Sequence, residues 1–259
     1  MMERMHPILI KFGNVAIYTY GLMMAVAFFI GITLARKEAD RVGQDSEKIM
    51  DLSFYILIGA VIGSRLFYVF TDPRTFLSDP VEIFRIWNGG LVFYGGFIMA
   101  VVVAMIYVKK AGMPLWQTAD IMAPGLAVGQ AIGRIGCFFA GCCYGKVCDL
   151  PWAITFNNPD SLAPQGLPLH PTQLYSVFSD FSIFVVLWLF RKKKQFQGQL
   201  FWLYVLLYGI TRPIVEIYRG DFRGQTFFQF LSISQVIGIS LAVVAAVMLV
   251  WLSRSKLKN

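Results

Sequence analysis

Three arginines lie inside apolar stretches of this chain, at Arg65, Arg134 and Arg212. A guanidinium does not give up its proton, and an unpaired charge at membrane depth costs several kcal/mol. The partner best matched to its planar set of donors is a phosphate group. Arg134 has the most distinctive setting, because it follows a series of glycines typical of closely packed helices: Gly125, Gly129 and Gly133, with Gly136 just beyond. The pattern indicates a buried anion site.

Arg212 belongs to a second polar pattern. Tyr208, Arg212 and Glu216 recur every four residues, and Arg219 follows three positions later, which places all four on one helical face. Two interpretations stay open: Arg212 and Glu216 neutralise each other, or they bind an anion together. Three interior arginines with one obvious carboxylate leave positive charge uncompensated, and this favours the anion.

His170 and Pro171 precede an apolar stretch that opens with Thr172 and Gln173. Proline suits the first helical position, and we expect Thr172 and Gln173 to satisfy free amides there. His170 is either a polar cap or part of an anion site, since helix N-termini favour anions. Tyr20, at the start of the first apolar stretch, fits either an aromatic belt or a ligand contact.

All four cysteines, Cys137, Cys142, Cys143 and Cys148, fall within one short segment in the pattern C-x4-C-C-x4-C. This is not a usual zinc spacing. Three interpretations remain: a disulfide in an oxidising compartment, inert packing thiols, or a metal or catalytic role, since Arg134 would lower the pKa of a nearby thiol.

Composition identifies the class of protein. Of the 259 residues, 57% are hydrophobic and 15% are charged, and the mean hydropathy is +0.61. Soluble domains are about a quarter charged, so we expect an all-α polytopic integral membrane protein. The net charge of +8 does not indicate a nucleic-acid partner, because the basic residues cluster between apolar stretches, where they set topology.

Seven stretches reach the length of about 20 residues that a membrane-spanning helix needs. They lie near 17–35, 51–70, 91–108, 119–137, 172–190, 199–217 and 232–252. The connectors on one side carry 13 basic residues: Arg36, Lys37, Arg41, Lys48, Lys109, Lys110, Arg191, Lys192, Lys193, Lys194, Arg254, Lys256 and Lys258. The other side carries 7: Arg4, Lys11, Arg74, Arg85, Lys146, Arg219 and Arg223. The positive-inside rule therefore predicts a cytoplasmic C-terminus and an N-terminus outside.

The first stretch is expected to be an uncleaved helix, because Arg36 and Lys37 follow where a signal peptide would need small residues. The chain shows no linker or clear repeat, which predicts one transmembrane domain over 1–259. Chemistry is expected on the outer side, at the loops 71–90 and 138–171. The first of these should include a short interfacial helix, and the second is too polar to span.

With these motifs in order, the chain resembles the bacterial prolipoprotein diacylglyceryl transferase family over nearly its whole length. Residues 133–145, GRIGCFFAGCCYG, are similar to the family signature GRIGNFxNGExxG. Five further segments support the resemblance: YG at 20–21, GSR at 63–65, GGLVFYGG at 89–96, HPTQLY at 170–175 and YGxxRxxxE at 208–216.

The resemblance implies transfer of a diacylglyceryl group from phosphatidylglycerol to the lipobox cysteine of an exported prolipoprotein, at the bacterial cytoplasmic membrane and without metal or cofactor. It implies the following catalytic residues: Arg134, Arg212, Tyr94, Glu216 and His170. It implies these substrate-binding residues: Arg134, Tyr20, Arg65, Tyr208, Gly133, Gly136 and Gly145. Membrane lipids and prolipoproteins are the expected partners.

Two departures from the family pattern matter. Tyr94 stands where many members have a histidine assigned as the base, and a phenol with a pKa near 10 is a poor base at neutral pH. We therefore expect Tyr94 to donate a hydrogen bond and leave Glu216, His170 or solvent as the base. Cys137 and Cys142 replace the signature's Asn and Glu, so the cysteines are not expected to be catalytic. The alternatives are a transporter of a small anion or lipid, and a paralogue with another acceptor.

Overall fold

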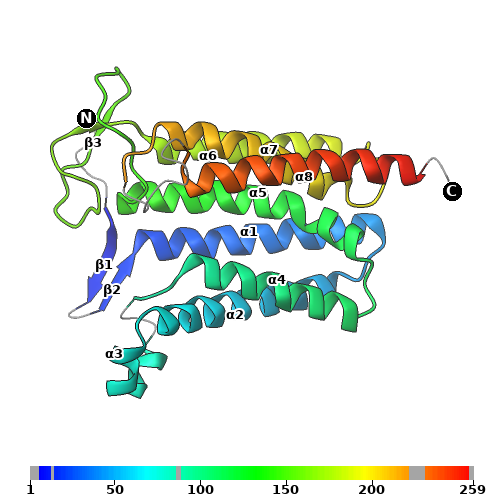
Figure 1. The fold of residues 1–259 in the computed structure, drawn as a ribbon, viewed down its shortest axis with the longest axis horizontal. Coiled ribbons are helices and arrows are strands. Elements are labelled where there is room, and N and C mark those ends of the chain that lie inside the picture. The colour runs from blue at the N-terminus through cyan, green and yellow to red at the C-terminus, as the bar shows by residue number, and fades with distance from the viewer. Residues whose placement is uncertain (1–5, 13–14, 86–88, 222–230, 257–259) are drawn as a thin grey trace. The chain divides into compact units, whose positions relative to one another are not determined.

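The computed structural model describes residues 6–12, 15–85, 89–221 and 231–256, and is dominated by helices (Figure 1). Seven of the described helices are long and apolar enough to cross a membrane: α1 (Thr19–Val42), α2 (Ser46–Thr71), α4 (Phe93–Lys110), α5 (Leu115–Ala140), α6 (Thr172–Phe190), α7 (Gln199–Ile217) and α8 (Ile233–Lys256). Each matches one predicted stretch, so the all-α, seven-span prediction is confirmed. Orientation stays a prediction. Arg4, Arg223 and Lys258 of the charge count lie outside the described residues.

Helix α1 is longer than its apolar stretch. The stretch ends near residue 35, whereas the helix continues to Val42. Its last turns carry an ion pair between Glu38 and Arg41, three residues apart, with 2.5 Å between Oε1 and Nη2. Such a pair stabilises a helical turn, so hydrophobicity marks where the span ends but not where the helix ends.

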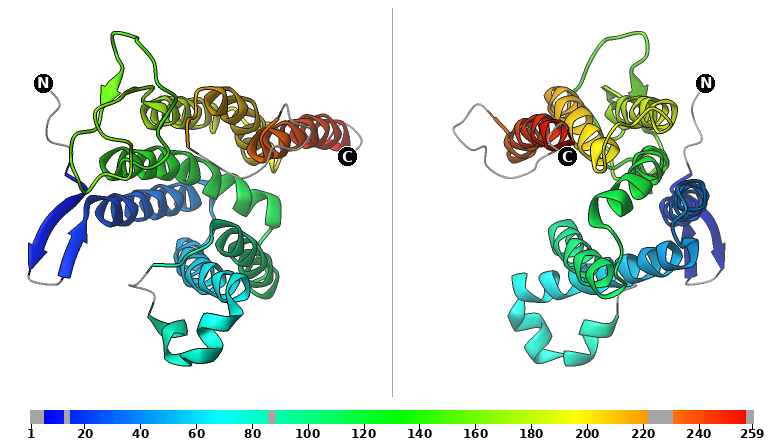
Figure 2. Two further views of the ribbon diagram at one scale, coloured as in Figure 1. Left: turned by 60° about the vertical axis from the view of Figure 1, so that its left-hand side comes forward. Right: turned by 90° about the vertical axis from the view of Figure 1, so that its right-hand side faces the viewer.

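The chain divides into two compact units, residues 1–34 with 119–259, and residues 35–118. In the first unit, helices α5, α6 and α7 share a core, and the course of these helices can be followed in Figure 2. Ala123 and Ala127 of α5 pack with Ile183 and Leu187 of α6 and with Leu200 of α7. The small α5 side chains let three helices meet closely. The single catalytic domain over 1–259 stays a prediction.

Glycines bring α1 and α5 together in this unit. A Cβ added to Gly125 would lie 2.7 Å from the carbonyl oxygen of Gly31, closer than real side chains approach backbone. At Gly129 the same atom would lie 3.6 Å from the oxygen of Ala27, an ordinary contact. Close packing therefore requires glycine at Gly125, as the small-residue pattern predicts, but does not require it at Gly129.

A buried carboxylate fixes the start of α7. Asp120 of α5, only 1% exposed, accepts hydrogen bonds from the backbone amides of Gly198 at 2.7 Å and Phe201 at 2.9 Å. Lys194 donates to the same carboxylate at 3.2 Å. Because the first amides of a helix have no partner within it, Asp120 caps α7 from a neighbouring helix.

The second unit is built on α2 and α4, which pack through glycines on both helices: Gly59, Gly63, Gly95 and Gly96. Along the chain, α2 and α4 are separated by α3 (Pro73–Ser78) and a short 3-10 helix, η1 (Pro80–Phe84). The prediction of a short helix in 71–90 is therefore confirmed, with two helices in place of one. Asp79 caps η1 by accepting from the amide of Val81 at 3.2 Å.

Two β elements of the first unit were not predicted. Strands β1 (Ile8–Phe12) and β2 (Val15–Tyr18) pair antiparallel, with Lys11 opposite Ala16. A Gly-Asn pair between two β-branched runs was the available signal. The segment 138–171 holds strands β3 (Ile154–Thr155) and β4 (Pro168–Leu169) and does not span, as expected. It has its own core, in which Phe156 and Leu169 are almost fully buried.

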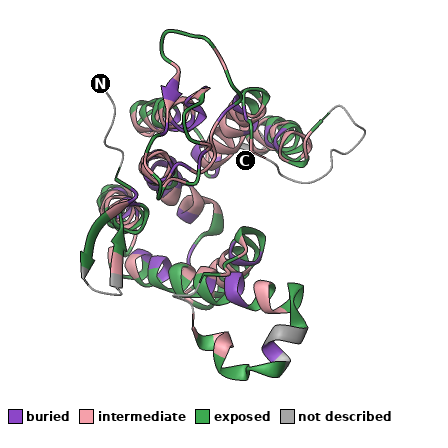
Figure 3. Ribbon diagram, turned by 90° about the vertical axis from the view of Figure 1, so that its left-hand side faces the viewer, coloured by how far each residue is buried: buried purple, intermediate pink, exposed green. Residues whose placement is uncertain are grey.

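The outward faces of the spanning helices are apolar. Exposed positions follow these helices in Figure 3, and they include Phe178, Leu189 and Val247, each at least 61% exposed. Exposure of large apolar side chains on this scale is unfavourable in water but suits the hydrocarbon core of a bilayer. The chain is thus built as a multi-pass membrane protein.

Candidate active site

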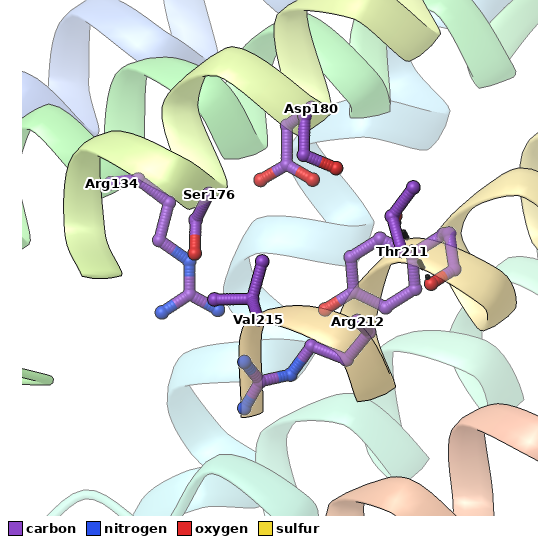
Figure 4. Close-up of a pocket in the computed structure, with 8 residues that line it drawn as sticks. Arg134, Ser176, Asp180, Thr211, Arg212 and Val215 are labelled. Atoms are coloured by element: carbon purple, nitrogen blue, oxygen red, sulfur yellow. Dashed lines mark hydrogen bonds between the residues drawn. The ribbon is translucent and has the colours of Figure 1, made fainter. Parts of the chain in front are cut away.

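A small pocket opens between α5, α6 and α7 in the first unit (Figure 4). Eight residues line it, and all but Val215 carry a polar group: Arg134, Ser176, Ser179, Asp180, Tyr208, Thr211, Arg212 and Val215. Arg134 lies six residues before the end of α5, and Arg212 lies five before the end of α7. At 1.5 Å per residue, both α-carbons lie about 7 to 9 Å below the helix ends. Both arginines thus line one pocket; their role in binding an anion stays a prediction.

Arg134 has no carboxylate partner among the described residues. Its Nη1 donates to the sulfur of Cys143 at 3.8 Å, and none of the ion pairs of the described part of the chain includes it. In Figure 4 its guanidinium extends toward the same part of the pocket as that of Arg212. This is the arrangement that a buried anion site requires.

Arg212 is paired, as the first of the two sequence interpretations proposed. Its Nη2 lies 2.8 Å from Oε2 of Glu216, and both side chains are at most 10% exposed. Glu216 also lies 3.9 Å from Nε of Arg219, and Arg219 forms an ion pair with Asp221 at 2.7 Å. Nη1 of Arg212 is nevertheless buried without a hydrogen-bond partner in the described structure, so a pocket ligand could still accept from it.

Three pocket residues on α6 were missed from sequence: Ser176, Ser179 and Asp180. Asp180 is 4% exposed and forms no ion pair within 4.0 Å among the described residues. Figure 4 places its carboxylate on the side of the pocket away from the guanidinium ends. A lone Asp in an apolar helix was the available signal, because such residues are expensive and usually functional.

Three of the four cysteines cluster beside Arg134. The Sγ atoms of Cys137, Cys142 and Cys143 lie within 4.8 Å of one another. No disulfide joins the four cysteines in the described structure. The cluster exists because α5 ends at Ala140 and Gly141 then takes a left-handed φ of 74°, which turns the chain back.

Hydrogen bonds polarise this cluster. The pKa of Cys143 is lowered because it accepts from the thiols of Cys137 and Cys142, and the cations Arg219 and Arg134 add to this shift. The pKa of Cys142 is raised by the same hydrogen bonds, chiefly that with Cys137. Burial alone would lower the pKa of Arg219, but hydrogen bonds to Asp221 and Cys143 raise it above its ordinary value.

The turn is held by the start of α6. Thr172 donates its hydroxyl to the carbonyl of Cys143 at 2.7 Å, and Gln173 donates its amide to that of Cys142 at 2.8 Å. The sequence prediction that these side chains satisfy helix amides is wrong: the helix has no side-chain cap and Pro171 is the cap residue. They stabilise the cysteine turn instead.

A family model described as prolipoprotein diacylglyceryl transferase matches residues 7–251. The chain belongs to this family. It is 37% identical over 236 residues to a phosphatidylglycerol–prolipoprotein diacylglyceryl transferase of Clostridium tetani, covering 91% of this chain and 93% of the relative. Enzymes with the same name from Vibrio atlanticus, 34% identical with 95% and 90% covered, and Pseudomonas fluorescens, 34% identical with 95% and 92% covered, are further relatives.

The transferase signature glycines act in packing here. A Cβ on Gly136 would approach Tyr20 and Met23 of α1 at 3.3 and 3.0 Å, so Tyr20 lies directly against the signature helix. At Gly133 the added atom would meet only the sulfur of Met24, at 3.4 Å. Gly145 bridges to Arg219, and its amide donates to the carbonyl of His170 at 3.0 Å. The ligand roles of these glycines stay predictions.

His170 lies beside this bridge, and it does not line the pocket. Its Nδ1 is 3.1 Å from the hydroxyl of Tyr175, and its ring contacts those of Tyr175 and Tyr218. In this transferase the described geometry gives His170 a place in an aromatic cluster next to the cysteine turn. Its assignment as a catalytic residue stays a prediction.

Arg65 and Tyr94 belong to the second unit. Arg65, 5% exposed, donates to backbone carbonyls of the α3–η1 loop, including Ile83 at 3.0 Å and Gly89 at 2.6 Å, and to that of Glu82. These bonds engage the Nε, Nη1 and Nη2 donors of Arg65. Tyr94 lies in the first turn of α4, about half exposed, and contacts Phe93. Their assignments as substrate-binding and catalytic residues of the transferase stay predictions.

Proposed function

We propose that this chain transfers the diacylglyceryl group of phosphatidylglycerol to the lipobox cysteine thiol of prolipoproteins, the first step of lipoprotein maturation. The product is a thioether, and glycerol phosphate is released. Membership of the transferase family and the names of the relatives support this activity. The pocket supports it independently, because its chemistry suits an anionic lipid.

The observation that carries the proposal is the pair of available guanidinium groups in one pocket. Arg134 has no carboxylate partner in the described structure, and Arg212 retains a buried, unpartnered Nη1. A phosphate at this place would accept from both. Buried donors without partners cost free energy, so the pocket gains more from such a ligand than a fully paired site would.

The proposed reaction is a displacement at carbon. The thiolate sulfur attacks the glycerol methylene, a carbon–sulfur bond forms, and the carbon–oxygen bond to phosphate breaks. The electron pair leaves with the phosphate oxygen, where negative charge grows. Arg134 and Arg212 stabilise that charge, because fixed donors aimed at a developing negative charge lower the energy of the transition state. Glu216 orients Arg212, and Tyr208 lines the pocket where it can donate to the headgroup.

Asp180 is our candidate for the group that accepts the thiol proton. Glu216 is poorly suited, because its carboxylate is already held by Arg212 and Arg219. The α-carbon of Asp180 lies eight residues into α6, about 12 Å from the helix end, deeper than those of the two arginines. The reacting methylene lies on the acyl side of the phosphate, which is the deeper side of the headgroup. Asp180→Asn should lower turnover, with a smaller loss as pH rises and solvent base replaces the carboxylate.

Reconstitution tests the activity. The purified chain is given phosphatidylglycerol and a lipobox peptide, and the peptide is examined by mass spectrometry for an added diacylglyceryl group. A matched peptide with Ser in place of the Cys should stay unmodified. Absence of product with active lipid present would reject the transferase proposal. Release of trapped phosphate or lipid from vesicles without product would favour the transporter, and modification of a different peptide would favour a paralogue with another acceptor.

We further propose that the protein lies in the bacterial cytoplasmic membrane, with its N-terminus outside. Basic connectors such as 191–194 lie at one end of α6 and α7, and the pocket arginines lie toward the other. This orientation puts the pocket toward the outer leaflet, where an exported lipobox arrives. Reporter fusions active only in the cytoplasm should be active at the C-terminus, and activity at the N-terminus would reject the orientation.

A further inference from the structure

The three clustered thiols have a geometry that the rest of the site does not use. Cys137, Cys142 and Cys143 present sulfur atoms within 4.8 Å of one another, whereas Cys148, also described, is not part of the group. Cys142 and Cys143 are adjacent in sequence, yet both sulfurs reach Cys137. Adjacent residues achieve this because Cys143 takes a left-handed φ of 62°, the only positive φ of a non-glycine residue in the described chain.

That backbone conformation has a cost. A left-handed residue with a Cβ is unfavourable by roughly 1–2 kcal/mol, and such residues tend to persist at functional sites. Hydrogen bonds from Thr172 and Gln173 to the carbonyls of Cys143 and Cys142 hold the turn in place. The hydrogen bonds to these backbone carbonyls would form with any side chain at positions 142 and 143. The turn by itself therefore does not explain why both positions hold cysteine.

The spacing of the sulfurs suits a thiophilic metal ion. Zinc–sulfur bonds are about 2.3 Å long, which puts the sulfurs of a tetrahedral site about 3.8 Å apart. Closing from the observed separations to that value needs side-chain shifts of about 1 Å or less. A three-thiolate site leaves one coordination position open, as metal sites with an exchangeable ligand do.

The surrounding charge also suits such an ion. Three thiolates and a divalent cation together carry one negative charge. Arg134 already donates to Cys143, and Arg219, 7% exposed, lies beside the same sulfur. Because Arg219 also pairs with Asp221, the guanidinium of Arg134 is the charge that compensates the complex. The group of possible ligands includes no carboxylate, and all-sulfur sites select soft ions over Mg²⁺ or Ca²⁺.

We propose that Cys137, Cys142 and Cys143 form a three-thiolate binding site for a thiophilic divalent cation such as Zn²⁺. From the sequence, a metal role was left open as one of three interpretations, because C-x4-C-C is not a usual zinc spacing; the left-handed turn is what brings the adjacent pair onto one ion. The proposal is independent of the transferase activity.

Cadmium binding tests it. The full chain is purified in detergent with reductant, which is then removed without oxygen, and Cd²⁺ is added while the ultraviolet charge-transfer absorbance of cadmium thiolates is followed. We expect saturation at one ion per chain and displacement by Zn²⁺ but not by Mg²⁺. Cys148→Ser is the matched control and should bind like the unchanged chain. Cys142→Ser and Cys143→Ser should each lose more than the 10- to 100-fold in affinity typical of outer-shell changes.

A second measurement does not depend on the folding of variants. Bound Cd²⁺ should protect Cys137, Cys142 and Cys143 of the unchanged chain from a maleimide reagent, with Cys148 still labelled, as read by peptide mass spectrometry. No saturable absorbance, equal protection of all four cysteines, or a loss in Cys148→Ser as large as in Cys143→Ser would each overturn the site. A disulfide among these three cysteines that persists after purification with reductant would overturn the site as well.

Discussion

Replacing Arg134 with alanine should remove most of the proposed transferase activity while leaving the protein folded. Arg134 forms no ion pair within 4.0 Å in the described structure, so its removal breaks no direct ion pair; Asp180, which lines the same pocket, has no such pair before or after the change. Its one described side-chain contact is the sulfur of Cys143, and a thiol without that donor can stay protonated. The effect of the change therefore falls on the ligand, not on the fold.

The magnitude follows from what Arg134 contributes. Loss of one preorganised donor to a developing oxyanion typically costs about 10²- to 10³-fold in kcat. Arg134 donates a full charge with geometry suited to two hydrogen bonds, and such bonds are about twice as strong as neutral ones. We therefore expect Arg134→Ala to lose about 10³-fold in kcat, or about 4 kcal/mol. Arg134→Lys keeps the charge without the planar donor pair. Its kcat should lie between that of Arg134→Ala and that of the unchanged chain.

The assay is the rate of diacylglyceryl addition to a lipobox peptide at saturating phosphatidylglycerol, with thermal unfolding measured in the same detergent. Lys192→Ala serves as a control, because Lys192 is an exposed cation in the connector after α6, at the end opposite the pocket. It should keep the activity of the unchanged chain. A kcat for Arg134→Ala within tenfold of that chain, in folded protein, would refute the phosphate role of Arg134.

Further predictions concern stability and are measured by thermal unfolding in detergent. Glu216→Gln leaves Arg212 and Arg219 without their shared buried carboxylate and should cost about 3–5 kcal/mol; adding Arg212→Met should recover part of that loss, and no recovery would argue against the pair. Gly125→Ala, whose Cβ would lie 2.7 Å from the oxygen of Gly31, should cost about 1–3 kcal/mol by overpacking. Gly129→Ala should be nearly neutral, and equal effects at the two glycines would contradict the α1–α5 contact. Asp120→Ala removes the cap of α7 and should cost about 0.5–2 kcal/mol or more, whereas unchanged stability would contradict the cap.

The spanning helices could be predicted because length and hydrophobicity suffice to define them. The pairing of Arg212 with Glu216 followed from their four-residue spacing. Asp180 could not be assigned to the pocket, because its contacts come from α5 and α7, far away in sequence. The backbone carbonyls that surround Arg65 could not be predicted, because nothing in the sequence shows which loop folds over it; its assignment to the substrate stays a prediction. The cysteine cluster depends on one φ angle, which composition does not encode.

The cap that Asp120 places on α7 also determines which way that helix faces. Arg212 lies 13 residues beyond the first residue of α7, about 20 Å along the helix axis. A shift of α7 by a single residue would turn every side chain by about 100° around that axis and move Arg212 off the pocket. Three hydrogen bonds to one carboxylate hold this rotation at the end of the helix remote from the chemistry. Asp120 thus sets the direction in which Arg212 points, although the two side chains are not in contact.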